Sequence, residues 1–242
     1  MRYILRVYKN DCVLERKYQG KPSPPDSNRS DIQEFSYKSR RRLAFVASNT
    51  DIEFKSMITL TYPRDFPGNG KDVKRQLQAF IRWLRHKLPT LDYLWFLEFQ
   101  KRGAPHIHML LNRPESDLPA KKDVSLRWYE ICGTGDKLHL KAGTRTEQLR
   151  SKDGGKRYTV KYAMKMYQKD VPAQFQNVGR FWGHSWRVKP RQKDMLGFMY
   201  FEQLENRLLS WRYKWHLGNP NVATLYNAAK ELSNEQNESQ SP

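Results

Sequence analysis

The sequence predicts an α+β fold in which a central antiparallel sheet carries helices packed on one face. Short apolar segments typical of strands occupy residues 56–62, 91–100 and 106–112. Between the first two, residues 72–88 place apolar side chains at helical spacing. The predicted order of elements is strand, helix, strand, strand, helix, strand, helix, which favours an antiparallel sheet with helices gathered on one side.

The first predicted strand is Tyr3–Val7. It is followed by a Gly- and Pro-rich stretch, residues 20–28, that we expect to be a loop or a disordered connector. The next strand is Ser56–Tyr62, which ends at Pro63 because proline has no backbone N–H to give to a sheet.

The strongest helix prediction covers Asp72–Leu88. Pro89 ends it, since a proline cannot continue a helix. Its apolar face consists of Val73, Leu77, Phe80, Ile81, Leu84 and Leu88.

Four further elements follow the central strands. We expect a helix over Lys121–Cys132, a short strand over Lys137–Lys141 and a helix over Lys156–Lys169. Met195–His216 is predicted to be mostly helical, or a strand followed by a helix.

Three regions are predicted from these elements. Residues 1–35 form an N-terminal extension, residues 36–217 form the main domain with its C-terminal helical region, and residues 218–242 form a polar tail.

The charge of the chain predicts nucleic acid as its partner. It has 44 Lys and Arg against 25 Asp and Glu, a formal net charge of +19. The basic residues are clustered, as in Arg40–Arg42 and Lys152–Arg157, and 13 Tyr and 7 Trp supply rings that could stack on bases.

Other classes are excluded by what the sequence lacks. The two cysteines, Cys12 and Cys132, cannot form a disulfide framework or a Cys-rich zinc site. No apolar run approaches membrane-spanning length and no signal-peptide core is present, so we expect a cytoplasmic protein without a membrane partner. A Walker phosphate-binding sequence is also absent, so no nucleotide cofactor is expected.

The first candidate site lies around a predicted hairpin turn. Side chains alternate across a strand, so Glu98 and Gln100 share one face and His106 and His108 share one face. If the two strands pair, the four groups converge, and two imidazoles with an oxygen ligand describe a divalent-metal site. The alternative is a half-buried strand whose polar face looks at solvent.

The second candidate site is a basic, tyrosine-bearing helix. Tyr158 and Tyr162 lie four residues apart and therefore on one face, flanked by Lys161 and Lys165. A phenol is a poor nucleophile near neutral pH because its pKa is about 10, and nearby ammonium groups would lower that pKa. The alternative is a helix whose tyrosines and lysines only cover its surface.

Taken together and in this order, three motifs resemble the HUH endonucleases, specifically rolling-circle replication initiator (Rep) proteins of phages and plasmids. Thr59-Leu60-Thr61-Tyr62-Pro63 is similar to their first motif and His106-Ile107-His108 to their metal-binding second motif. Tyr158-x-x-Lys161-Tyr162-x-x-Lys165 is similar to their nucleophile helix of the two-tyrosine type. The resemblance covers roughly residues 40–190.

The resemblance implies a ferredoxin- or RRM-like sheet with the histidines on a middle strand and the tyrosine helix packed nearby. It also implies Mg²⁺ or Mn²⁺ as cofactor, held by His106, His108 and either Glu98 or Gln100. The expected activity is site-specific cleavage and joining of single-stranded DNA, or of a hairpin, at a replication origin. Tyr158 or Tyr162 would form a 5′-phosphotyrosine, Lys161 or Lys165 would stabilise charge, and a host helicase would unwind the duplex.

Further side chains are expected to contact the DNA: Thr59, Thr61, Arg102, Arg157, Arg180, Trp182, His184 and Trp186. Alternatives to the replication initiator are an HUH transposase, a relaxase, a non-catalytic basic DNA-binding protein and an RNA-binding module. Relaxases often place the tyrosine near the N-terminus and use three histidines, and neither feature is present here.

Overall fold

The computed structural model describes residues 3–16, 32–150, 158–159, 171–198 and 230–231. The chain forms two compact units, one of Asn28–Lys189 and the other of Met1–Ser27 with Pro190–Pro242. The predicted bounds at residues 35 and 217 stay a prediction. Within the described part of the chain, no helix is long and apolar enough to cross a membrane.

The smaller unit contains an antiparallel sheet of three strands. Its strands are β1 (Tyr3–Val7), β2 (Cys12–Arg16) and β8 (Asp194–Phe198), in the order β2-β1-β8. The predicted strand at Tyr3–Val7 is therefore confirmed. The prediction over Met195–His216 lies outside the described residues after residue 198.

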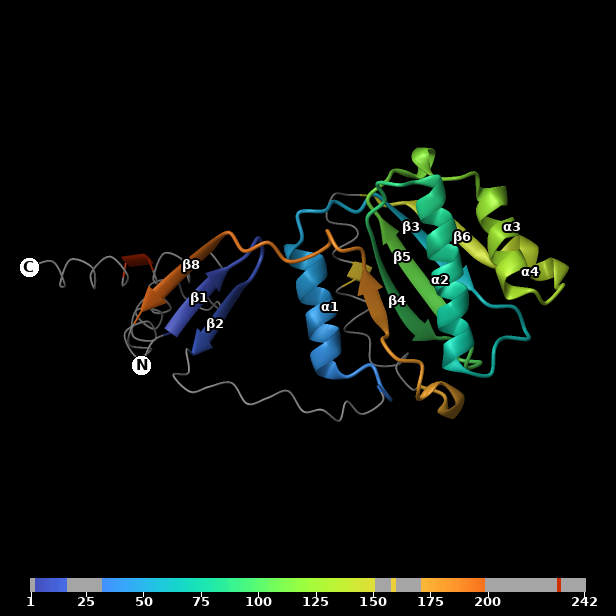
Figure 1. The fold of residues 1–242 in the computed structure, drawn as a ribbon, viewed down its shortest axis with the longest axis horizontal. Coiled ribbons are helices and arrows are strands. Elements are labelled where there is room, and N and C mark those ends of the chain that lie inside the picture. Colours follow the sequence, from blue (N-terminus) through green and yellow to red (C-terminus); the bar gives the residue numbers. More distant parts are fainter. Residues whose placement is uncertain (1–2, 17–31, 151–157, 160–170, 199–229, 232–242) are drawn as a thin grey trace, which may run out of the picture. The chain divides into compact units, whose positions relative to one another are not determined.

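The larger unit contains a five-stranded antiparallel sheet in the order β6-β3-β5-β4-β7 (Figure 1). The strands are β3 (Ser56–Thr61), β4 (Tyr93–Phe99), β5 (Pro105–Leu111), β6 (Thr144–Gln148) and β7 (Trp182–His184). The helices are α1 (Tyr37–Asn49), α2 (Gly70–Lys87), α3 (Lys121–Cys132) and α4 (Lys137–Ala142), with 3₁₀ turns at Glu115–Asp117 and Ala173–Phe175. The predicted α+β class is confirmed.

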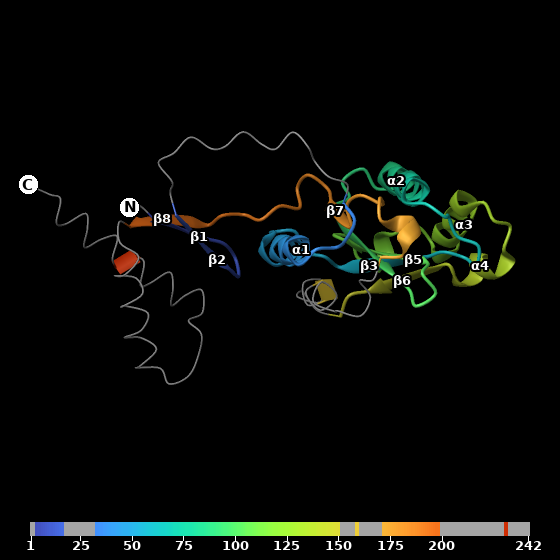
Figure 2. The same ribbon diagram turned by 90° about the horizontal axis from the view of Figure 1, so that it is seen from below.

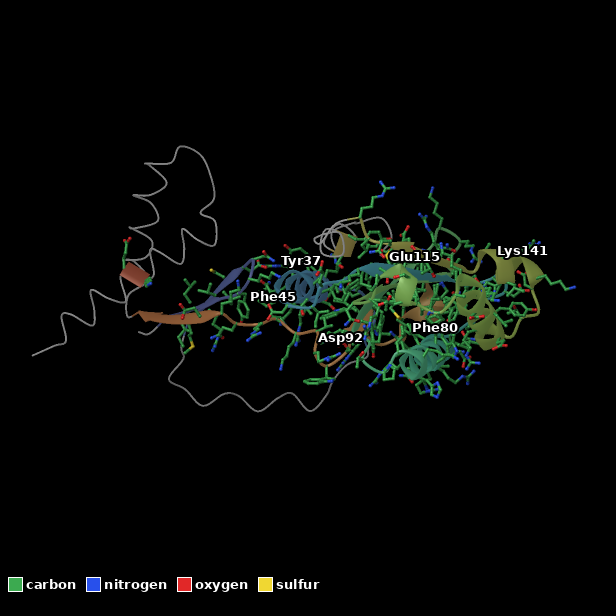
Figure 3. All side chains as sticks on the ribbon, turned by 90° about the horizontal axis from the view of Figure 1, so that it is seen from above. Tyr37, Phe45, Phe80, Asp92, Glu115 and Lys141 are labelled. Atoms are coloured by element: carbon green, nitrogen blue, oxygen red, sulfur yellow. The ribbon has the colours of Figure 1, made fainter. Side chains whose placement is uncertain are left out.

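Helix α2 covers the sheet face that carries Trp95, Leu97, Ile107 and Met109 (Figure 2). The helix begins where the Asn69 side chain accepts a hydrogen bond from the Asp72 N–H at 2.9 Å, and it ends on three basic residues, which suits the helix dipole. Phe80, labelled in Figure 3, is fully buried on the apolar side of α2.

The side of α2 toward α3 is sealed by aromatic rings. Trp128 of α3 is fully buried and meets Phe80 and Tyr62 edge to face, with ring centroids 5.9 and 5.0 Å apart. The Trp128 Nε1–H donates to the Thr61 carbonyl at 2.9 Å, which fixes the end of β3.

One predicted element is wrong: Lys137–Lys141 is not a strand but part of α4. The Asp136 side chain accepts from the Leu138 N–H at 2.9 Å and so caps a helix. The alternation that indicated a strand put Leu138 inside, whereas this leucine is 75% exposed. The buried residue is His139, whose Nε2 donates to the Thr61 carbonyl at 2.8 Å.

Two elements were missed because their apolar signal is weak. Helix α1 is rich in arginine, and its start is marked by the Ser36 side chain, which accepts from the Ser39 N–H at 3.3 Å. Strand β6 has the sequence Thr-Arg-Thr-Glu-Gln and forms an edge of the sheet, where only β3 pairs with it.

Strand β7 at the other edge is anchored by a buried carboxylate. Asp92 accepts hydrogen bonds from Ser185 Oγ at 2.8 Å and from Arg187 Nε at 3.1 Å. It also forms an ion pair with Arg187 at 3.0 Å. Because β7 has only three residues, these bonds hold it beside β4.

Lys74 of α2 is held against the sheet. Its Nζ lies 4.2 Å from the centroid of the Trp95 ring and donates to the Arg180 carbonyl. Burial, and then the nearby charge of Arg180, lower the pKa of Lys74 from 10.5 to about 7.

This lowered pKa predicts a pH-dependent stability. Between pH of about 7 and 10.5 the unfolded chain keeps a proton that folded Lys74 has lost, so stability rises with pH across this window. We expect the free energy of unfolding, measured with urea, to rise more steeply with pH in the unmodified protein than in Lys74→Met. Lys71→Met, on the same helix but exposed, is the control. Equal slopes for the unmodified protein and Lys74→Met would contradict the prediction.

Candidate active site

The hairpin β4–β5 brings the predicted polar groups together. Gly103 has φ of 78°, which allows a turn closed by the Gly103 N–H to the Gln100 carbonyl at 2.8 Å. This turn sets a register in which Glu98 lies opposite His106 and Phe96 lies opposite His108. All four side chains therefore project from the sheet face opposite α2.

His106 and His108 are close neighbours on this face. Their ring centroids lie 4.6 Å apart and the rings are nearly perpendicular. Burial, then the charges of His108 and Arg102, lower the pKa of His106 from 6.5 to about 4. His106 is thus a neutral imidazole near neutral pH, the form that binds a metal ion.

Each histidine contacts a threonine of β3. The Thr61 hydroxyl lies 3.1 Å from Nδ1 of His106, and the Thr59 hydroxyl lies 3.3 Å from Nδ1 of His108. These contacts follow from the register, in which Thr59 is opposite His108 and Thr61 opposite His106. A partner on Nδ1 fixes the ring and leaves Nε2 for another group, as is usual around metal-binding histidines. The two threonines, predicted as DNA contacts, therefore orient imidazoles.

The carboxylate of Glu98 faces the second histidine. Glu98 Oε2 lies 3.4 Å from Nε2 of His108, and both side chains are buried. Among the described residues, Glu98 Oε2 has no hydrogen-bond donor. A buried carboxylate oxygen without a donor is costly, and a bound cation would satisfy it.

Gln100 and Arg102 serve the backbone at the same end of the sheet. The Gln100 carbonyl oxygen accepts from Arg102 Nε at 3.0 Å, while its amide nitrogen lies 3.5 Å from Nδ1 of His106. Arg102 also donates to the Pro63 carbonyl at 2.7 Å and to the Tyr62 carbonyl at 2.5 Å. Arg102, predicted as a DNA contact, thus ties the turn to the end of β3.

Tyr158 lies on the histidine face. Residues 158–159 are helical, and the Tyr158 hydroxyl is 3.2 Å from Nδ1 of His108. Its ring also packs near Phe96, with centroids 6.3 Å apart. The sequence left Tyr158 and Tyr162 as equal candidates, and the structure places Tyr158 in contact with the histidine pair.

The other residues of the predicted nucleophile helix, Arg157, Lys161, Tyr162 and Lys165, lie outside the described residues. Within the described part of the chain, no three His, Cys, Asp or Glu side chains already stand around one point as metal ligands. The two imidazoles and the Glu98 carboxylate are nevertheless a donor set suited to Mg²⁺ or Mn²⁺.

The remaining predicted DNA contacts gather at β7. Trp182 Nε1 donates to Ser39 Oγ at 3.0 Å, and its ring stacks on His184 with centroids 5.7 Å apart. Arg180 is exposed just before the strand, and Trp186, just after it, is 77% exposed.

Comparison with known proteins relates the chain to replication proteins. Residues 55–167 match the model of a family of replication-associated proteins of the ORF2 type. The replication-associated protein of Pseudomonas phage Pf3 is 25% identical over 229 residues, which are 89% of this chain and 81% of the phage protein. No solved structure matches. The chain is therefore similar to phage replication-associated proteins over a stretch that includes the hairpin and both tyrosines.

Proposed function

We propose that this chain is a rolling-circle replication initiator of the HUH type, which nicks and rejoins single-stranded DNA through a tyrosine. The observation that carries the proposal is the contact of the Tyr158 hydroxyl with Nδ1 of His108, 3.2 Å apart, beside a second imidazole and a buried carboxylate. The similarity to the replication-associated protein of a phage supports the role in replication. The net charge of +19 suits a nucleic-acid substrate.

His106, His108 and Glu98 would hold the divalent cation. Bound there, the cation would supply Lewis-acid polarisation of the scissile phosphate. Glu98 is the preferred third ligand because its carboxylate oxygen is buried without a donor, whereas the Gln100 oxygen already accepts from Arg102.

His108 also acts on the nucleophile. In the tautomer with its proton on Nδ1, the ring donates to the Tyr158 oxygen and stabilises the phenolate. Thr59 contacts the same nitrogen and keeps the ring in place. This arrangement lowers the cost of ionising a phenol whose ordinary pKa is about 10.

The Tyr158 oxygen attacks the phosphorus of the origin strand. A bond forms between the phenol oxygen and phosphorus, and the bond from phosphorus to the 3′-oxygen breaks. The phenol proton passes to solvent, and the departing 3′-oxygen takes up a proton to give a 3′-OH that can prime synthesis. The 5′-phosphotyrosine retains the phosphodiester's energy, so rejoining needs no ATP.

The proposal extends to the cell. The substrate is a single strand or an extruded hairpin at the origin, and the protein acts in the cytoplasm. The chain has no Walker sequence, so a host helicase unwinds the duplex.

A metal-dependent covalent adduct is the expected result of the direct test. The full chain is mixed with single-stranded oligonucleotides tiled from its own replicon, with Mn²⁺ or with EDTA, and resolved by denaturing electrophoresis. One tile should give a band shifted by the attached oligonucleotide, and EDTA should remove it. Binding to many tiles without any adduct would instead identify a non-catalytic DNA-binding protein.

A further inference from the structure

A groove of about 470 Å³ lies between the start of α1 and strand β7, at an edge of the five-stranded sheet. This volume is in the range of small-ligand sites. Six of the lining residues carry the argument: Lys38, Ser39, Arg42, Arg180, Trp182 and His184.

Two stacked rings line the groove. The planes of Trp182 and His184 are inclined by 29°, and their centroids lie 5.7 Å apart. The bond from Trp182 Nε1 to Ser39 Oγ ties the indole to α1, and the bond between Nδ1 of His184 and the Ser185 carbonyl, 2.8 Å long, fixes the imidazole. Rings that are held in place in this way form a platform on which a nucleobase can stack.

Cations line the same groove. Lys38 and Arg42 are four residues apart on α1 and therefore share one side of the helix. Both side chains are exposed, as is that of Arg180. Among the described residues that line the groove, none is acidic. The combination of rings and cations is complementary to a nucleotide, with its apolar base and anionic phosphate.

The groove and the histidine pair share one face of the sheet. Phe96 of β4 pairs with Trp182 of β7 on one side and with His108 of β5 on the other. Residues directly opposite each other project to the same face, so Trp182 lies two strands from His108. Two strand spacings amount to roughly 10 Å, a distance that a few nucleotides of one strand can span.

We propose that this groove binds one nucleobase, with its phosphate, of the single strand that is cut at the histidine pair. The base stacks on Trp182, and Lys38, Arg42 and Arg180 neutralise the phosphate. The groove thereby holds the strand at a fixed distance from the scissile phosphate. This inference rests on the proposed function, since it names where that substrate is held.

Binding of two chains that differ only in their bases tests the inference. The full-length protein in EDTA is titrated, with fluorescence anisotropy as the readout, into labelled oligothymidylate and into an abasic strand with as many phosphates. We expect Trp182→Ala to weaken binding of oligothymidylate at least about fivefold and to leave binding of the abasic strand nearly unchanged. Trp182→Phe keeps a stacking ring and should retain most of the preference for bases.

Helix α1 offers a matched pair of charge variants. Arg42→Ala should weaken binding of both strands more than Arg41→Ala does, because Arg42 lines the groove and Arg41 does not. Equal losses for Trp182→Ala on the two strands overturn the inference. If Trp182→Ala fails to fold, as judged by thermal unfolding, equal losses for Arg42→Ala and Arg41→Ala overturn it.

The two proposals fail separately. A covalent adduct without the base preference at Trp182 would overturn the groove alone. A base preference at Trp182 in a protein that forms no adduct on any tile would overturn the proposed nuclease and leave a single-strand binding site.

Discussion

Tyr158→Phe is expected to lower cleavage of the origin strand more than about 10⁴-fold, the scale on which loss of a nucleophile acts. The phenylalanine keeps the ring near Phe96 but removes the oxygen that lies 3.2 Å from His108. Binding to the same strand should be almost unchanged, because affinity comes from Lys and Arg. The measurement is the rate of appearance of the cleaved strand under single-turnover conditions.

Tyr129→Phe on α3 is the matched control, since it removes a hydroxyl far along the chain from the histidine strand. It should cleave at the unmodified rate. A Tyr158→Phe protein that cleaves as fast as this control would assign the nucleophile elsewhere, with Tyr162 the next candidate from the sequence.

His106→Ala and His108→Ala are each expected to lower cleavage at least about 10³-fold, because each removes an imidazole from the proposed cation site. Affinity for the uncut strand should fall little. The double readout, cleavage rate and anisotropy titration on one oligonucleotide, separates loss of chemistry from loss of binding. Thr59→Val should give an intermediate loss of about 10- to 100-fold, since it removes only the hydroxyl that orients His108.

His86→Ala is the control for these histidines, because His86 is exposed at the end of α2. It should keep full activity. Normal cleavage by His106→Ala in the presence of Mn²⁺ would contradict the proposed cation site.

The central hairpin could be predicted from sequence because its signals are local. Strand parity puts Glu98 and Gln100 on one face and His106 and His108 on one face, and Gly103 permits the tight turn between the strands. The same parity could not rank Glu98 above Gln100. That ranking needs the contact between Gln100 and Arg102, which is a property of side-chain packing.

Contacts between elements distant in sequence escaped prediction. The pairing of Thr59 and Thr61 with the two imidazoles depends on the register of β3 against β5, which the motif itself does not encode. Their type and spacing suggested DNA contact instead. The position of strands side by side is fixed by the core, not by local periodicity.

The groove beside β7 shows the same limit. The sequence indicated Arg180, Trp182 and His184 as DNA contacts but gave no reason to join them to α1. The bond between Trp182 and Ser39 makes that connection, and it adds Lys38 and Arg42 to the lining. The helix was missed because only Leu43, Val46, Ala47 and Asn49 of its 13 residues are buried.

The most direct test of the account is to identify the residue that carries the DNA. The covalent adduct formed with Mn²⁺ is digested with nuclease and protease, and the modified peptide is sequenced by mass spectrometry. The account predicts a 5′-phosphonucleotide on Tyr158. A nucleotide on a different residue, or none on any peptide while the DNA is cut, would contradict it.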